Sequence, residues 1–230
     1  MLEAIRAGKP VLCEKPLTPD AASSRRIVDA EVAHGKRLVQ VGFMRRYDQG
    51  FQQLRRRVQI HDPAFGQLRL LHCAHRADGV PGPPSAEFLI EDCLAHEFDQ
   101  VRWITGQEII SVQVLGSPTS DNTRGRVEDP IFVSVELTGG ISVVIEVNIF
   151  SGVGYEVRCE AIFDQGTVTV GAAEQHTSSL VTSGGKTSFE VATEYRERFQ
   201  LAYDAEFIDW ADWDCFRWQR MGRLCSSACH

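Results

Sequence analysis

The chain has 230 residues, of which 43% are hydrophobic and 24% are charged. This composition is typical of a globular protein, and the length suits one large domain or two small ones. The formal net charge of −7 argues against a nucleic-acid-binding surface, which needs clustered Lys and Arg. No apolar run approaches the roughly 18 residues of a membrane span, and the N-terminus does not resemble a signal peptide.

Seven cysteines are scattered along the chain without a CxxC pair. Cys225 and Cys229 are four residues apart, but no second pair completes a set of zinc ligands. An odd number of scattered cysteines is typical of thiols in a reducing compartment. The sequence therefore predicts a cytoplasmic protein without a metal site.

The N-terminal segment predicts a strand, a helix and a second strand in parallel. Residues 10–14 and 37–43 are short apolar runs, as expected of buried parallel strands. A helix is expected over residues 19–34, with Thr18 as its N-cap and Gly35 as its stop. The side chains expected to be buried on it are Ala22, Ile27, Val28 and Val32.

Beyond residue 48 the pattern changes to that of a mostly antiparallel sheet with helices on one face. A helix is expected over residues 50–58 and a strand over 68–75. Strands joined by glycine-containing turns follow the next helix, which is typical of hairpins. These further strands are expected at 110–115, 131–137, 141–149, 157–163 and 167–170, with a surface loop or short hairpin at 172–187.

Residues 89–106 predict the central amphipathic helix, which ends at Gly106. Its expected core residues are Ile90, Leu94, Phe98, Val101 and Ile104. Asp92 and His96 are four residues apart and therefore share one helical face. A carboxylate beside an imidazole suits general acid–base chemistry. The alternative is a capping Asp92 and a hydrogen-bonded core His96.

Three motifs occur in a defined order: Glu14-Lys15-Pro16 after the first strand, GFMRRYD at 42–48 after the second, and Asp92-x-x-x-His96. Together they resemble the Gfo/Idh/MocA oxidoreductases, and among these the myo-inositol 2-dehydrogenases. The resemblance covers roughly residues 1–205.

The resemblance implies three regions. Residues 1–46 are expected to be an α/β remnant of a Rossmann dinucleotide-binding domain. Residues 47–208 are expected to form an α+β substrate and oligomerisation domain, with a mostly antiparallel open sheet covered by helices. Residues 209–230 hold three of the four Trp and three of the seven Cys without a clear period, and are expected to be an atypical tail. The sequence contains no GxGxxG turn, so we expect the chain to lack the N-terminal part of the Rossmann domain.

The resemblance also implies a reaction, the oxidation of a ring hydroxyl of a cyclic polyol or sugar with NAD or NADP. His96 is expected to be the general base, held by Asp92. Lys15 would favour the developing alkoxide, unless it is a solvated turn lysine. Glu14, Lys15 and Pro16 are the expected cofactor contacts.

Arg45, Tyr155 and Tyr203 match the family's substrate-binding positions, and Arg and Tyr are suitable partners for a polyol. The alternatives are a salt-bridged surface Arg45 and tyrosine rings packed in the sheet. Inositol enzymes often carry Asn where this chain has Ala77, which cannot hydrogen-bond a hydroxyl through its side chain. That difference argues against inositol itself as the substrate.

Two other functions remain open. The chain could be a non-catalytic binding or assembly module, because the open sheet commonly serves for self-association into homo-oligomers in this family. It could also be a dehydrogenase of another sugar, or a biliverdin-reductase-like enzyme. Affinity for NAD(H) separates an enzyme from an assembly module, and a substrate panel separates the enzymes.

Overall fold

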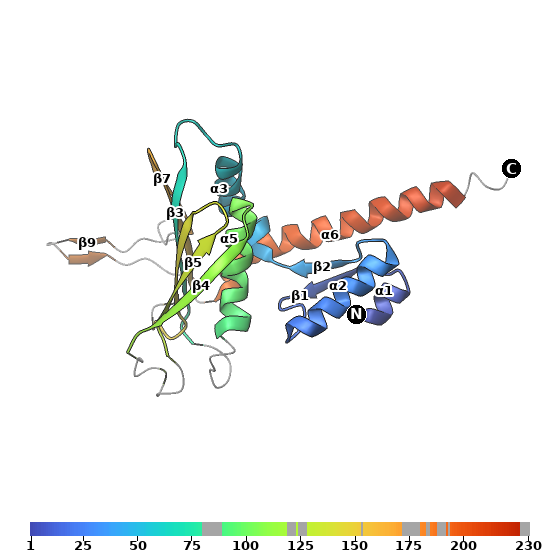
Figure 1. Cartoon of the computed structure of the whole chain (residues 1–230), viewed down its shortest axis with the longest axis horizontal. Coiled ribbons are helices and arrows are strands. Elements are labelled where there is room, and N and C mark those ends of the chain that lie inside the picture. The colour runs from blue at the N-terminus through green and yellow to red at the C-terminus, as the bar shows by residue number, and fades with distance from the viewer. Residues whose placement is uncertain are drawn as a thin grey trace. The chain divides into compact units, whose positions relative to one another are not determined.

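The computed structural model describes residues 1–79, 89–118, 123, 128–152, 154–171, 180–182, 185–187, 192 and 194–225 (Figure 1). For residues 180–182, 185–187 and 213–225 it describes the backbone alone. The chain divides into two compact units: Met1–Tyr47 with Leu201–His230, here called unit 1, and Asp48–Gln200, here called unit 2.

Unit 1 contains the predicted strand–helix–strand motif. Its N-terminal elements are α1 (Leu2–Arg6), β1 (Val11–Glu14), α2 (Ala21–His34), β2 (Val39–Gly42) and the 3₁₀ turn η1 (Met44–Tyr47). Strands β1 and β2 pair in parallel from Val11 opposite Val39 to Glu14 opposite Gly42. Ile5, Ile27 and Leu38 form the small core between these elements. The predicted parallel strand–helix–strand motif is thereby confirmed.

The start of α2 differs from the prediction. Asp20 is the N-cap: it has extended backbone geometry (φ −141°), and its carboxylate accepts a hydrogen bond of 2.7 Å from the amide of Ser23. Thr18 instead donates its hydroxyl to the carbonyl of Asp20 at 2.8 Å. Asp20 directly precedes the helix, so its carboxylate reaches the third amide of the helix, whereas Thr18 lies two residues further out. Gly35 ends the helix at φ 74°, as predicted.

The predicted burial along α2 is wrong except at Ile27. Val28 is 41% exposed and Val32 is 73% exposed, and Ala22 is exposed as well. In the part of unit 1 that the structure describes, the parallel sheet has two strands, so it covers one row of the helix. A helix face is buried only where a neighbouring element reaches it.

Unit 2 is built on a sheet with six described strands in the order β4-β5-β6-β3-β7-β8. The strands are β3 (Leu68–Arg76), β4 (Ile109–Gly116), β5 (Ile131–Leu137), β6 (Ser142–Asn148), β7 (Glu156–Phe163) and β8 (Thr167–Val170). β3 and β6 pair in parallel, and the other neighbours are antiparallel. The predicted mostly antiparallel sheet is confirmed.

Helices cover one face of this sheet, and among the described residues no helix covers the other face, here called the open face. Strand β5 alternates buried and exposed side chains along Ile131–Leu137, which is the pattern of a strand with one solvated face. Helix α3 (Gln49–Gln59) packs on α5 (Ala95–Thr105), and both lie along the same side of the sheet in Figure 1. The core of unit 2 lies between these helices and the sheet.

The predicted central helix consists of two segments. A π-helical stretch, η2 (Leu89–Leu94), leads into α5, which ends at Gly106 with φ 68°. A π-helix has one more residue in each hydrogen-bonded ring than an α-helix, so it shifts the α-helical stripe. Ile90, predicted to be buried, is accordingly 53% exposed. The predicted core residues Leu94, Val101 and Ile104 are buried, and Phe98 is half-buried.

Helix α6 (Tyr195–Cys225) runs without a break through most of the predicted atypical tail, and residues 226–230 lie outside the described residues. The strands β9 (Leu180–Thr182) and β10 (Gly185–Thr187) pair antiparallel, as the hairpin alternative predicts. The rest of that segment lies outside the described residues. Cys13, Cys73, Cys93 and Cys159 are thiols rather than disulfides. Among the described helices, none is both long and apolar enough to cross a membrane.

Candidate active site

The predicted cofactor motif lies at the carboxyl edge of the β1–β2 sheet. Glu14 is the last residue of β1, and Lys15, which is half-buried, follows it. Gly42 lies beside it at the end of β2, where an added Cβ would be 3.2 Å from the carboxyl group of Glu14. The glycine therefore permits a close approach of the two strand ends. Ligands of parallel α/β sheets bind at this edge.

Arg45 follows the end of β2 in η1 and is 2% exposed. The alternative of a surface arginine is therefore wrong, because a surface group would be solvated. A buried guanidinium keeps its charge and has to be held by polar groups. Its position after a strand of the parallel pair is compatible with the predicted substrate role, which stays a prediction.

Glu206 of α6 is a buried carboxyl group of unit 1 that the sequence did not indicate. It is 1% exposed. Burial, and after it the negative charge of Glu14, raise the pKa of Glu206 to about 7. A hydrogen bond from the amide of Phe43 and the positive charge of Arg46 lower this pKa, but by less. A single glutamate on a long helix carries no signal of burial in its sequence.

Tyr203, a half-buried residue of α6, also belongs to unit 1. Asp209, which opens the predicted tail, accepts a hydrogen bond of 2.8 Å from the hydroxyl of Tyr47. That hydroxyl accepts a further one of 3.1 Å from Gln40. Burial and the bond to Asp209 raise the pKa of Tyr47. The start of the predicted tail is thus tied into the hydrogen bonds of unit 1.

The predicted acid–base pair lies in unit 2. Asp92 is half-buried in the π-helical stretch η2. His96 is the second residue of α5 and is 6% exposed. π-Helical turns within helices occur frequently at functional sites. The residues lie on consecutive turns of one helical segment, as predicted. Lys15, Arg45 and Tyr203 belong to unit 1, and Asp92, His96 and Tyr155 belong to unit 2.

A second histidine and a glutamate accompany His96 in unit 2. Glu97, the next residue of α5, has its Oε1 3.4 Å from Nδ1 of His75 at the end of β3. The side chains of Glu97 and His75 are 0% and 6% exposed. Sequence reasoning missed this contact. Two features of the sequence could have indicated this contact: a histidine near the end of an apolar strand, and an acidic residue directly after the candidate base.

Tyr155 packs edge-on against the ring of His75, with 5.7 Å between the ring centres and an interplanar angle of 82°. Its ring also meets the rings of Tyr195 and Phe199 at 6.5 and 6.4 Å. These contacts fit the alternative of a packed tyrosine ring. The predicted role of Tyr155 in substrate binding stays a prediction.

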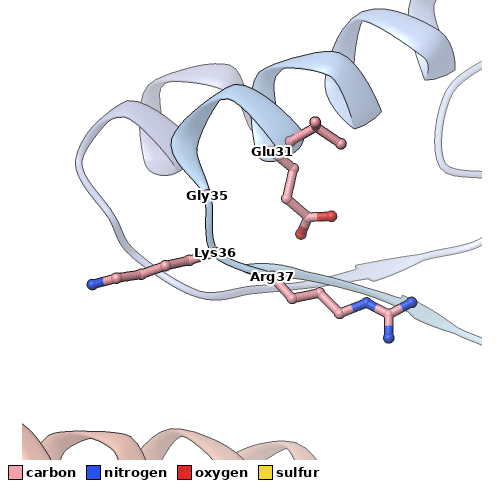
Figure 2. A pocket seen from close by; sticks show the side chains of 5 residues that line it. Glu31, Gly35, Lys36 and Arg37 are labelled. Atoms are coloured by element: carbon pink, nitrogen blue, oxygen red, sulfur yellow. The ribbon is translucent and has the colours of Figure 1, made fainter.

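A pocket of about 220 Å³ lies at the end of α2, and none of the predicted site residues lines it (Figure 2). It is lined by Glu31, Val32, Gly35, Lys36 and Arg37. The Glu31 carboxylate, which points toward the strand in Figure 2, accepts bonds of 2.6 and 2.7 Å from the amides of Leu38 and Val39. This carboxylate joins the helix to β2, so the pocket is part of the scaffold.

Comparisons with known proteins agree with this arrangement. Residues 1–43 match a family model described as an oxidoreductase family with an NAD-binding Rossmann fold. Residues 51–169, more than half of the chain, match the GFO/IDH/MocA C-terminal domain. The two matches meet near the division between the units.

Individual relatives point to the same family. Inositol 2-dehydrogenase 4 of Saccharopolyspora erythraea is 44% identical over 212 residues, which are 92% of this chain and 61% of the relative. Inositol 2-dehydrogenase of Streptomyces avermitilis is 43% identical, over 92% of this chain and 60% of its own. The chain thus spans about three fifths of the length of these relatives.

A solved structure has a similar fold. The myo-inositol dehydrogenase from Lactobacillus casei, in complex with NAD(H) and myo-inositol, superposes with a TM-score of 0.81 and 29% identity. The match covers 92% of this chain and 61% of that one. On the family match, the shared fold and the three motifs, this chain belongs to the Gfo/Idh/MocA family of oxidoreductases.

Proposed function

We propose that this chain carries the acid–base and substrate-binding part of an NAD(P)-dependent oxidoreductase of the inositol 2-dehydrogenase type. The reaction is oxidation of a ring hydroxyl of a cyclic polyol or sugar to a ketone. The observation that carries the proposal is the buried His96 four residues after Asp92 on the η2–α5 segment, in a chain 44% identical to an inositol 2-dehydrogenase.

In the proposed mechanism His96 takes the proton of the substrate hydroxyl. At the same time the hydrogen on the carbon that bears this hydroxyl leaves as hydride. Asp92 orients the imidazole and stabilises its protonated form. Lys15 places a positive charge near the oxygen, which favours the alkoxide as it develops. NAD or NADP, when bound, accepts the hydride. Proton and hydride together account for the two hydrogens lost by the alcohol.

The residues of unit 1 fit one part of a dinucleotide site. The carboxyl ends of the parallel strands β1 and β2 meet at one edge, and Glu14, Lys15 and Pro16 would contact the cofactor there. The sequence contains no GxGxxG turn, which in such folds receives the pyrophosphate. An acidic side chain at the ribose 2′-hydroxyl distinguishes NAD from NADP in such folds, and the sequence does not identify one, so assays with both cofactors decide between them. We also propose that residues 1–46 are this nucleotide-binding part, residues 47–208 the substrate domain, and residues 209–230 the tail.

Substrate contacts are proposed for Arg45, Tyr155 and Tyr203, whose side chains can donate to ring hydroxyls. Ala77 directly follows β3, and its amide donates a hydrogen bond of 3.0 Å to the carbonyl of Asn148. Its methyl side chain cannot replace a hydrogen-bonding group, so a polyol or sugar other than inositol is a candidate substrate. A reducing, cytoplasmic location is proposed from the scattered thiols.

The second candidate function is assembly through the open face of the sheet. Leu115 of β4 and Phe132 of β5 are opposite each other in register and are 52% and 37% exposed. Exposed apolar side chains on a sheet face favour association. A homo-oligomer built on this face is compatible with the enzyme function, and as a function of its own it would make the chain a non-catalytic module.

The experiment is a titration of the purified chain with NADH, followed by nicotinamide fluorescence, and then a panel of polyols and sugars assayed with NAD and NADP. Saturable binding and turnover that His96→Ala abolishes would support the dehydrogenase. Near-normal turnover of His96→Ala would contradict the mechanism. A chain that binds no NADH but forms a defined oligomer would favour the assembly module.

A further inference from the structure

The first turn of α5 carries two buried ionisable side chains in succession, His96 and Glu97. Glu97 is fully buried. A buried carboxylate is costly unless polar groups or charges compensate it. The imidazole of His75, 3.4 Å away, is one such group. Glu97 is therefore held at a defined position in the core of unit 2.

His75 is itself fixed at the centre of the sheet. Strand β3 lies between β6 and β7, and in register His75 is opposite Val147 on one side and Val157 on the other. The edge-on contact with the Tyr155 ring holds the imidazole from a further side. The contact between Glu97 and His75 thus ties the first turn of α5 to the central strand of the sheet.

From this geometry we propose that Glu97 is a positioning residue, which orients the imidazole of His96 by anchoring the first turn of α5 to His75. This inference rests on the proposed function of His96. Consecutive residues of an α-helix point about 100° apart, so a side chain anchored at one position sets the direction of the next. Misplacing a reacting group by about 1 Å can lower a rate by about 100-fold.

The test uses Glu97→Gln, His75→Gln and the double variant in the full chain, with Glu91→Gln as the control. Gln keeps the shape of Glu and removes its charge, and Glu91 is an exposed acidic residue of the preceding turn. The first readout is the ¹⁵N spectrum of the imidazoles, which reports the tautomer and surroundings of His96. The second is kcat for the polyol that the wild-type chain turns over best, measured together with KM for the cofactor.

We expect both single variants to shift the ring signals of His96, and Glu91→Gln to leave them unchanged. In an active chain, kcat should fall by about 10- to 100-fold while KM for the cofactor stays within about twofold. The double variant should be no slower than the slower single variant, because the two residues act as one unit.

Unchanged His96 signals in both folded single variants would overturn the proposal. So would a double variant whose fold-loss in kcat equals the product of the two single losses. If Glu97→Gln does not fold, His75→Gln decides in the same way. If the wild-type chain shows no turnover, the spectra still decide on the positioning role, and the missing turnover counts against the proposed function alone.

Discussion

Arg76 binds Glu146 with both arms of its guanidinium group: Nε lies 2.7 Å from Oε1 and Nη2 lies 2.9 Å from Oε2. The remaining nitrogen, Nη1, lies 2.9 Å from Oε2 of Glu156. Arg76 lies on β3 and the two glutamates on the neighbouring strands β6 and β7. One side chain therefore ties three strands together on the open face of the sheet.

Arg76→Met should destabilise unit 2 by about 1–3 kcal/mol, because it leaves two half-buried carboxylates without their shared cation. The matched control is Arg69→Met, which breaks an ion pair with Asp164 whose side chains are 63% and 35% exposed. That loss should be clearly smaller, because ion pairs exposed to solvent contribute little to stability. Urea unfolding at neutral pH measures both, and equal losses would contradict the importance of the three-strand contact.

The effect of Arg76 should also depend on pH. The guanidinium of Arg76, more than any other group, lowers the pKa of Glu146 in the folded protein. A lowered pKa contributes stability above the pKa of the unfolded chain, about 4.3, and that stability is lost as the pH falls through the folded value. The difference between wild type and Arg76→Met should therefore shrink below about pH 4.

Glu206→Gln should remove a pH dependence with the opposite sign. The folded pKa of about 7 lies above the ordinary value of 4.5. Its contribution to stability is therefore fully present below about pH 4.5 and is lost as the pH rises to about 7. The whole change is on the order of 3 kcal/mol. Gln resembles the protonated carboxyl group, so the variant should be more stable than wild type at pH 8 and equal to it near pH 4.

Unfolding of unit 1, followed between pH 4 and pH 8, measures this effect. Glu3→Gln is the control, because Glu3 is an exposed residue of α1. It should leave the pH dependence intact. A Glu206→Gln curve that runs parallel to the wild-type curve would show that Glu206 does not titrate in this range.

Two glycines with nearly the same backbone geometry should respond differently to Ala. Gly171 has φ +73° and Gly140 has φ +76°, both in the left-handed region. A Cβ at Gly171 would collide with the backbone carbonyl oxygen of Val157, whereas nothing lies within 4 Å of one at Gly140. Gly140→Ala should lower the free energy of unfolding by about 1–2 kcal/mol, because Ala disfavours the left-handed backbone conformation. Gly171→Ala should exceed that by at least about 2 kcal/mol, because the carbonyl belongs to the β7 ladder. Chemical denaturation measures the free energy of unfolding of both variants. Equal losses would refute the predicted difference between the two glycines.

Asp48 has two separable roles. Its Oδ1 accepts a hydrogen bond of 3.1 Å from the amide of Phe51 and caps α3. Its Oδ2 lies 2.9 Å from Nη1 of Arg198, and both side chains are more than four fifths buried. Asp48→Asn keeps a capping oxygen and loses the charge, so we expect a cost of about 1 kcal/mol. Asp48→Ala loses both and should cost about 2–3 kcal/mol. Thermal unfolding measures the stability lost in each variant. Equal losses in Asp48→Asn and Asp48→Ala would contradict two separate roles of Asp48.

Local patterns were enough to predict most of the sheet. The alternation along Ile131–Leu137 and the turn at Gly139 and Gly140 require only neighbouring residues, and the structure has both strands of this hairpin. The helix stops at Gly35 and Gly106 were correct for the same reason, because a left-handed glycine is a property of a single residue. The three motifs identified the family because each stands at the end of a strand or in a helix that short-range patterns reveal.

Other features depended on segments far apart in the chain. The burial of α2 followed from how many strands lie beside it, and the exposure of Ile90 from a π-helical stretch that no apolar period shows. The contact of Glu97 with His75 joins α5 to β3, and the pKa of Glu206 depends on Glu14, which is almost two hundred residues earlier. The burial and the pKa of a side chain depend on which groups lie near it in space. Only the tertiary structure brings these groups together, so local sequence patterns did not reveal them.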